Sequence, residues 1–335
     1  MGPSFNVYGY RFRVEGDAPD AVAALASDFA FFADAEPVTS PVATIRVCSR
    51  APDYASLPPL RATVYTPRNI SYRDGDVTLV DYHGRGIGRH HRGTGDFEIT
   101  TLSPDLQYEA CYLFLLSQLG EALDRRGLHR VHAVGISLRG RAVLVLLPMG
   151  GGKSSLCTEL LADPEVRLLS DDSPLVDTEG GVHAFPTRIG LLPGSAAKIP
   201  AEYLRTVDRM SFGPKTLVDY RYFAERVVAR AEPGFVCLGS RTLAAQGRIT
   251  TVSRATALRR FVRDCVVGMG LFQGLEFFFQ KSTGELLERA PVAASRLKAS
   301  WALVCRSQLI ELELGRDLAG NARLLLDHVR AHGVA

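Results

Sequence analysis

Residues 141–160 read RAVLVLLPMGGGKSSLCTEL and contain the pattern that decides the fold. The stretch opens with an unbroken aliphatic run, Ala142 to Leu147, which is typical of a strand buried on both faces. A glycine-rich turn follows, and the chain then continues as an apparent helix to about Ala162. A buried strand, a glycine-rich turn and a helix in this order predict a phosphate-binding loop in an α/β fold.

The turn matches the right half of the phosphate-loop motif G-x-x-x-x-G-K-[ST], although Leu147 stands at the motif's first glycine. Its glycines let the backbone N–H groups face one point, where the helix N-terminus adds partial positive charge. Lys153 can reach the β- and γ-phosphates, and the Ser154 hydroxyl can ligate Mg²⁺. A purely structural glycine turn is the less favoured alternative. The predicted binding residues for ATP and Mg²⁺ are Gly150, Gly151, Gly152, Lys153, Ser154 and Ser155.

A pair of acidic residues follows the next aliphatic segment. Val166 to Leu169 is expected to form a strand, and it is followed by Ser170, Asp171 and Asp172. One carboxylate can hold Mg²⁺, directly or through water, while the other accepts a proton from an attacking hydroxyl group. The alternative is an Asx turn that ends the strand. The residues alone do not assign one role to each aspartate.

Two longer segments resemble a known family. Residues 126–161, RGLHRVHAVGISLRGRAVLVLLPMGGGKSSLCTELL, and 166–191, VRLLSDDSPLVDTEGGVHAFPTRIGL, resemble the HPr kinase/phosphorylase superfamily, especially its HPr-kinase-related members from biosynthetic gene clusters. Those proteins share an RG-x-x-x-x-HA segment, a G-x-S-G-x-G-K-S loop, an L-L-S-D-D strand and a following F-P segment. The match is specific over about 125–195. It implies a mixed-sheet P-loop core of the HPr kinase and phosphoenolpyruvate carboxykinase type.

The resemblance also implies roles for individual residues. Asp171 would be the general base, Asp172 and Ser154 would be the metal ligands, and His132 would lie near the reacting phosphoryl group with Lys153. The family's loop serine falls at Met149. The chain has no clear copy of the glycine-rich element with which the HPr enzymes bind HPr, so HPr is not the expected acceptor.

The rest of the sequence predicts two regions of an α/β protein. Residues 1–127 form a strand-rich region that ends in a long helix from Ser103 to Arg126, and residues 128–335 form the kinase core with C-terminal helices. A basic segment with His83, His90 and His91 is interpreted as a solvated hairpin rather than a metal site. In the second half we expect strands at Gly234 to Leu238, Trp301 to Cys305 and Leu309 to Leu314, and helices at about Ser253 to Val267, Gly284 to Ser300 and Leu318 to Ala331.

The composition excludes several classes of protein. Among 335 residues, 39 Lys and Arg stand against 36 Asp and Glu, and a formal charge of +3 does not suggest nucleic acid as a partner. The six cysteines include no CxxC pair, which argues against a zinc site or a redox dithiol. No apolar stretch approaches the ~20 residues of a membrane span, and no secretion signal is recognisable. The expectation is a soluble, cytoplasmic protein without a membrane partner.

Together these features predict an ATP-dependent kinase that phosphorylates a hydroxyl group of a peptide serine or threonine or of a small metabolite, in a biosynthetic pathway. One alternative is a nucleotide-binding regulatory or scaffold protein without catalytic activity, suggested by Leu147 and Met149. A carboxykinase-like or phosphorolytic reaction is another. The sequence leaves open the phosphoryl acceptor, the preferred nucleotide base and the oligomeric state, including a possible homo-oligomer.

Overall fold

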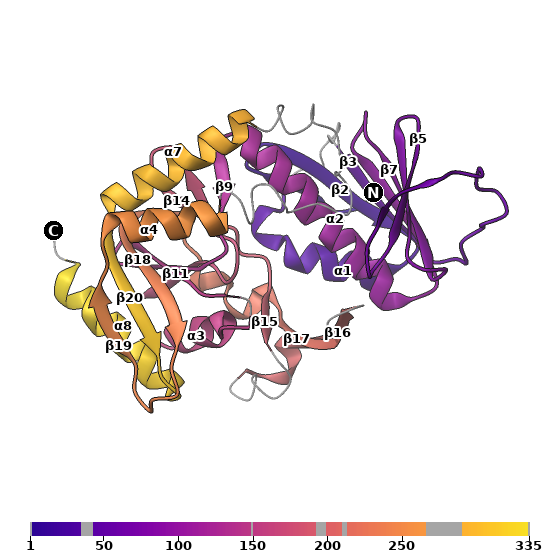
Figure 1. Ribbon diagram of the computed structural model, residues 1–335. Helices are drawn as coiled ribbons and strands as arrows, with labels where there is room; N and C mark the ends of the chain where they lie inside the picture. Colours follow the sequence, from indigo (N-terminus) through magenta and orange to yellow (C-terminus); the bar gives the residue numbers. More distant parts are fainter. Residues whose placement is uncertain are drawn as a thin grey trace. The chain divides into compact units, whose positions relative to one another are not determined.

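The computed structural model describes residues 2–34, 43–148, 150–191, 199–209, 213–265 and 290–333. These residues form a mixed α/β structure, as predicted, and strands predominate in it (Figure 1). They divide into two compact units. The first unit contains the described residues of Met1–Leu123 and Arg205–Thr216, and the second contains those of Asp124–Leu204, Leu217–Phe272 and Arg289–Ala335.

The first unit is built on one large sheet whose strand order is β1-β2-β3-β8-β7-β6-β5-β4. Most neighbouring strands are antiparallel, whereas β3 runs parallel to both β2 and β8. A tight turn at Tyr8 and Gly9, both with positive φ, separates β1 from β2. The strands are β1 Ser4–Val7, β2 Tyr10–Gly16, β3 Ala43–Cys48, β4 Ala62–Tyr65, β5 Ile70–Asp74, β6 Val77–Asp81, β7 Gly86–His91 and β8 Asp96–Thr101.

Two helices, α1 (Pro19–Asp28) and α2 (Pro104–Arg125), pack on this sheet. Phe114 of α2 stacks on Phe97 of β8 with ring centroids 4.2 Å apart. Phe29, which follows α1, contacts Phe12 of β2 edge to face at 5.3 Å. Pro104 occupies the first helical position of α2, as expected for a residue that lacks an N–H group. Short 3-10 turns complete the local structure, one of them η1 (Ala30–Phe32).

His90 departs from the solvated hairpin predicted for the basic segment. The hairpin of β6 and β7 exists, with His83 at its exposed turn and His91 exposed at its end. His90, however, lies on the face of β7 that packs against α2, where it is only 2% exposed. Its ring meets Phe114 at 4.9 Å, and its Nε2 lies 3.2 Å from Nε2 of Gln118. Burial, followed by the charge of His91, lowers the pKa of His90 to about 4.

This lowered pKa predicts that acid destabilises the first unit. The unfolded imidazole takes up a proton near its ordinary pKa of 6.5, whereas the folded one resists until about pH 4, so folding stability is lost as the pH falls through this window. At about pH 5 the loss is about 2 kcal/mol. We expect His90→Gln to flatten the dependence of the urea midpoint on pH, measured by circular dichroism. The exposed neighbour variant, His91→Gln, serves as control, and an unchanged slope in His90→Gln would contradict the assignment.

The second unit has a mixed sheet with the strand order β12-β10-β11-β18-β14-β13-β9, and β20 pairs β18 and β19. β11, β18 and β20 are parallel, and they form the centre of this sheet. The β10 and β11 hairpin turns at Arg139 and Gly140, which both have positive φ, as this two-residue turn requires. The strands are β9 Leu128–Arg130, β10 Val134–Leu138, β11 Arg141–Leu146, β12 Val166–Ser170, β13 Leu175–Asp177, β14 Val182–His183, β18 Arg230–Arg241, β19 Arg248–Thr251 and β20 Gln308–Leu314.

Helices cover both faces of this sheet (Figure 1). α3 and α8 contact each other on one side, and α4 and α7 contact each other on the other. Buried residues of α3 and α8, such as Leu156 and Leu325, form one hydrophobic core with Val143 and Val145 of β11. The helices are α3 Lys153–Leu160, α4 Arg254–Phe261, α7 Ala290–Arg306 and α8 Leu318–His332. The remaining short elements of this unit are β15 Ile189–Leu191, η2 Ala201–Tyr203, η3 Tyr220–Tyr222 and η4 Ala224–Arg226. Most residues of β16 Leu204–Arg209 and β17 Gly213–Val218 belong to the first unit.

The prediction of a strand from Trp301 to Cys305 is wrong, because these residues belong to α7. The buried residues of this part of α7 are Ala299, Ser300, Leu303 and Val304, a spacing that belongs to a helix. Five residues are too few to distinguish the two periods. The predicted continuation of a helix to Val267 and the start of another at Gly284 lie outside the described residues.

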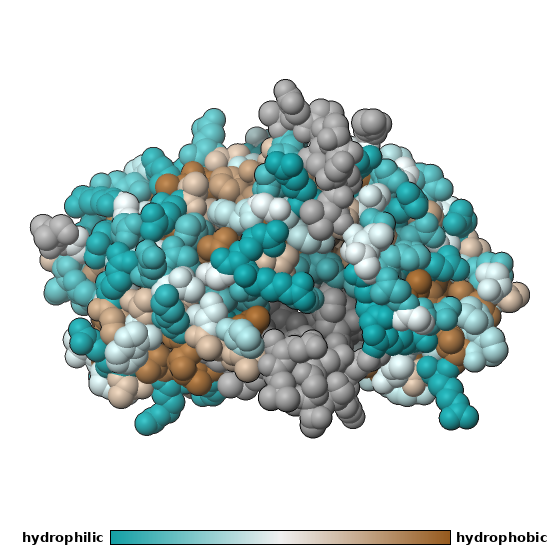
Figure 2. Space-filling view, turned by 90° about the horizontal axis from the view of Figure 1, so that it is seen from above, coloured by the Kyte–Doolittle hydropathy of each residue, from teal (hydrophilic) through white to brown (hydrophobic). Residues whose placement is uncertain are grey.

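The described helices, the surface and the cysteines each relate to a prediction made from the composition. Among the described helices, none has the length and apolar character needed to cross a membrane. On the face drawn in Figure 2, hydrophilic residues predominate and hydrophobic ones occur in small separate groups. All six cysteines are free thiols, and all but the half-buried Cys305 are buried.

Candidate active site

The predicted site residues meet at one edge of the sheet in the second unit. β18 runs parallel to β11, and β10 lies antiparallel between β11 and β12, so the ends of β11, β12 and β18 reach the same edge. The start of β10 lies there too. Ligands of open α/β sheets bind beyond such strand ends. The glycine turn after β11, the acidic pair after β12 and His132 before β10 are therefore neighbours.

Two glycines of the turn after β11 have positive φ. Gly150 has φ 74° and Gly152 has φ 91°, conformations that residues with a Cβ rarely adopt. The N–H of Gly151 donates to the carbonyl of Pro148 at 3.0 Å, which closes the turn. Gly152 is the N-cap of α3, so the partial positive charge of the helix is directed at the turn. Met149 lies outside the described residues.

A glycine on the neighbouring strand accommodates Leu147 at the position of the motif's first glycine. The Leu147 side chain is 2% exposed and belongs to the hydrophobic core below the loop. A Cβ at Gly239 of β18 would lie only 2.5 Å from Cδ2 of Leu147. The missing side chain at Gly239 therefore makes room for the Leu147 side chain.

Lys153, the first residue of α3, directs its ammonium group back over the loop. Its Nζ donates to the carbonyls of Leu147 at 2.8 Å and Pro148 at 3.3 Å, and it lies 2.9 Å from Nε2 of His132. The residue is 8% exposed. An ammonium group has three N–H donors, which match these three acceptors. The loop and His132 thus hold the charged group in place.

His132 connects Lys153 with the second aspartate. Its Nδ1 lies 3.1 Å from Oδ1 of Asp172, while its Nε2 faces the Lys153 ammonium. A carboxylate accepts and an ammonium donates, so both contacts are satisfied together when the imidazole is neutral with its proton on Nδ1. The side chain of Asp172 is 58% exposed and that of His132 is 30% exposed. The histidine therefore orients an accessible carboxylate beside the loop.

Asp171 has a different environment from Asp172. It is 6% exposed, and its Oδ2 accepts a hydrogen bond of 2.8 Å from the hydroxyl of Ser154. Burial, the Asp171 charge and a hydrogen bond to Asp171 raise the pKa of the neighbouring Cys157 thiol far above its ordinary value. Asp171 thus lies beneath the loop, joined to the serine that was predicted to bind metal.

The chemistry of this donor set suits Mg²⁺. The Ser154 hydroxyl and the Asp171 carboxylate present hard oxygen ligands at the loop. Mg²⁺ typically takes one or two carboxylates from the protein and further oxygens from substrate phosphates. Within the described ranges, no three or more His, Cys, Asp or Glu residues gather into a metal site. A Mg²⁺ ion bound by Ser154 and Asp171 would take its remaining ligands from water or from substrate phosphates.

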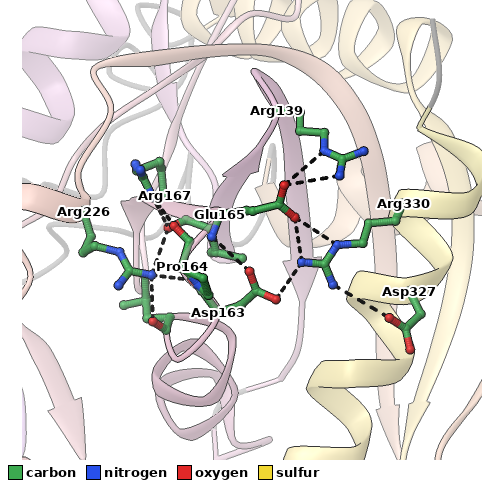
Figure 3. A network of polar contacts seen from close by, with 10 residues as sticks. Arg139, Asp163, Pro164, Glu165, Arg167, Arg226, Asp327 and Arg330 are labelled. Atoms are coloured by element: carbon green, nitrogen blue, oxygen red, sulfur yellow. Dashed lines mark hydrogen bonds and ion pairs between the residues drawn. The ribbon is translucent and has the colours of Figure 1, made fainter.

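The connection between α3 and β12 is fixed by arginines (Figure 3). The Arg330 guanidinium of α8 bonds to Oδ2 of Asp163 at 2.6 Å and to Oε2 of Glu165 at 2.9 Å, and Arg139 bonds to Glu165 from the other side. Burial alone would raise the pKa of Asp163, but the hydrogen bonds from Arg330 and from the Glu165 amide outweigh it and lower this pKa. Arg226 binds backbone carbonyls of the same connection, including that of Asp163. These contacts fix the start of the strand whose end carries the two aspartates.

A second buried network supports the segment before His132. Asp124 accepts from Nδ1 of His129 at 2.8 Å and from Arg296, while Nε2 of His129 lies 2.8 Å from the hydroxyl of Ser295. This order of serine, histidine and aspartate is also that of hydrolytic triads. The cavity beside it has a volume of only about 10 Å³, about one water molecule. Arg296 also donates to the backbone carbonyl of Arg130 at 3.2 Å, so the network is structural.

The structure brings together the loop residues Gly150 to Ser155 with His132, Asp171 and Asp172. Ser155 is half-buried on α3, where its carbonyl accepts from the Thr158 hydroxyl at 2.8 Å. Sequence reasoning missed Arg241, the last residue of β18. A Cβ at Gly152 would lie 3.2 Å from Nη1 of Arg241, so this guanidinium is next to the loop. No sequence motif marks Arg241, because only the pairing of β18 with β11 brings it there.

No family model matches the chain, and no curated protein matches it in sequence. The function is consequently inferred from the chemistry of the site together with the resemblance described above.

Proposed function

We propose that this protein is a Mg²⁺-dependent kinase of the HPr kinase/phosphorylase type. It transfers the γ-phosphoryl group of ATP to a hydroxyl group, either of a peptide serine or threonine or of a small metabolite. The observation that carries the proposal is the contact chain from Lys153 through His132 to Asp172, beside a loop whose glycines have positive φ. Phosphoryl transfer to a hydroxyl uses a cation that binds phosphate and a carboxylate that accepts the proton of the hydroxyl, and here one imidazole contacts both side chains.

The contacts favour one division of labour between the aspartates. Asp171 is buried and bonded to Ser154, so it belongs with the Mg²⁺ ligands. Asp172 is exposed and oriented by His132, so it can reach an incoming hydroxyl and act as the general base. This division is the opposite of the one that the resemblance implies, and the two make different predictions for variants.

The reaction is an in-line displacement. The acceptor oxygen forms a bond to the γ-phosphorus as the bond from that phosphorus to the β,γ-bridging oxygen breaks, and ADP leaves with the electron pair. The acceptor proton passes to the Asp172 carboxylate. Lys153 and the N–H groups of the loop stabilise the charge on the phosphate oxygens. Mg²⁺, when bound, neutralises part of the same charge.

The test is to incubate the protein with Mg-ATP and candidate acceptors, namely hydroxyl-bearing peptides and small metabolites, and to measure the products by mass spectrometry. We expect an acceptor to gain the mass of one phosphoryl group while ADP forms in equal amount. Release of inorganic phosphate without phosphorylated acceptor would indicate a hydrolase. Binding of Mg-ATP without turnover would support the alternative of a nucleotide-binding regulator, and absence of nucleotide binding would overturn both.

A further inference from the structure

Arg241 has a position that its strand fixes. Gly239 and Arg241 are two residues apart on β18, so their Cα–Cβ directions lie on the same face of the sheet. Leu147 fills the space over Gly239. The Arg241 guanidinium lies beside Gly152, because a Cβ added at Gly152 would be 3.2 Å from Nη1 of Arg241. The side chain is thus held along the loop by the strand next to it.

The region around Arg241 gathers positive charge. The N-terminus of α3 and the Lys153 ammonium lie at the same loop. Within the described residues, the guanidinium of Arg241 has no hydrogen-bond or ion-pair partner. Many other arginines of the second unit are paired, for example Arg248 with Glu313 and Arg330 with Asp163. A guanidinium has five donors suited to phosphate oxygens, so an anionic group matches this position.

The strand order separates Arg241 from the residues that act on the transferred group. β10 and β12, which bring His132 and the two aspartates, lie on one side of β11, and β18 lies on the other. The γ-phosphoryl group must lie toward Asp172 to meet an acceptor. The phosphates that stay with the nucleoside therefore extend toward Arg241.

We propose that Arg241 is a second cationic phosphate-binding residue, which holds the diphosphate part of the nucleotide. The inference rests on the proposed function, since it takes the loop as the nucleotide site. Arg241 binds ATP and ADP through the same phosphates and makes no contact that exists only during transfer. Its contribution is accordingly uniform binding, which changes KM and leaves kcat unchanged.

The experiment compares Arg241→Ala with the wild type by calorimetry, using Mg-ATP and Mg-ADP as probes. We expect both affinities to fall by about 10- to 100-fold, as for the loss of a charged hydrogen bond. KM for ATP should rise by a similar factor while kcat stays the same. The matched control is Arg248→Ala, which changes an exposed arginine on β19, the next strand along the chain. This variant should bind both nucleotides as the wild type does.

The possible outcomes separate this inference from the proposed function. A wild type that binds neither nucleotide would overturn the proposed function and this inference with it. A wild type that binds both, with unchanged affinities in Arg241→Ala, would overturn the role of Arg241 alone. Loss of ATP affinity without loss of ADP affinity would place the guanidinium on the γ-phosphate and refute its assignment to the diphosphate. Equal losses in Arg248→Ala would show a general charge effect, which also refutes it.

Discussion

The Asp172→Asn variant is expected to bind Mg-ATP as tightly as the wild type and to transfer its phosphoryl group about 10²–10⁴-fold more slowly. The asparagine amide has the same size as the carboxylate, but it cannot take up the proton that the acceptor hydroxyl loses. His132 would lose the carboxylate that its Nδ1 faces at 3.1 Å, while the loop and its contacts with Lys153 stay in place. Calorimetry for Mg-ATP and single-turnover transfer rates provide the two measurements.

Asp171→Asn is the matched variant, because it makes the same chemical change at the adjacent residue. Asp171 accepts from the Ser154 hydroxyl under the loop, so its loss should weaken nucleotide binding in the presence of Mg²⁺. Binding measured with EDTA in place of Mg²⁺ should change little. A melting temperature recorded for both variants controls for misfolding, since Asp171 is buried.

The pair of variants distinguishes the two possible assignments. Binding loss in Asp171→Asn with transfer loss in Asp172→Asn supports the division proposed from the contacts. The reverse pattern supports the division implied by the family resemblance, with Asp171 as the base. Equal binding defects in both variants would refute any division of labour between them.

The part of the site that the sequence predicts is the part that is contiguous in the chain. Strand β11, the glycine turn and α3 follow one another, so periodicity and glycine content predict the loop without knowledge of tertiary structure. The two aspartates could be placed near the loop because the ends of parallel strands meet at one edge. Their different environments could not be predicted, since burial of Asp171 and exposure of Asp172 depend on how the chain turns after β12.

The residues that the sequence did not predict reach the site through strand pairing. Gly239 and Arg241 are distant from the loop in sequence, and the parallel pairing of β18 with β11 makes them neighbours of Leu147 and Gly152. His90 shows the same limit in the first unit, because a strand in a basic segment still buries alternate residues. Local patterns specify elements, whereas the register between elements decides which side chains meet.

The Lys153→Ala variant is expected to lose about 10- to 100-fold in affinity for ATP and about 10²–10³-fold in transfer rate. The smaller loss reflects a charged hydrogen bond to phosphate in the ground state. The larger one reflects the charge that develops on the phosphate oxygens as the γ-phosphoryl group moves, which the Lys153 ammonium over the loop is placed to meet. Calorimetry and single-turnover rates again separate the two effects.

The structure adds a further expectation for this variant, which distinguishes a phosphate-binding lysine from a merely structural one. Lys153 donates to the carbonyls of Leu147 and Pro148, so Lys153→Ala also removes contacts that hold the loop in the absence of nucleotide. Lys153→Arg keeps the positive charge and the donors but changes their geometry, and it should keep most of the ATP affinity while transferring more slowly. If both variants bind ATP like the wild type, Lys153 does not contact the phosphates. A lysine that binds phosphate should lower the ATP affinity of Lys153→Ala even at temperatures where the variant is fully folded. If the affinity falls only at temperatures where the variant begins to unfold, Lys153 holds the loop and does not bind phosphate.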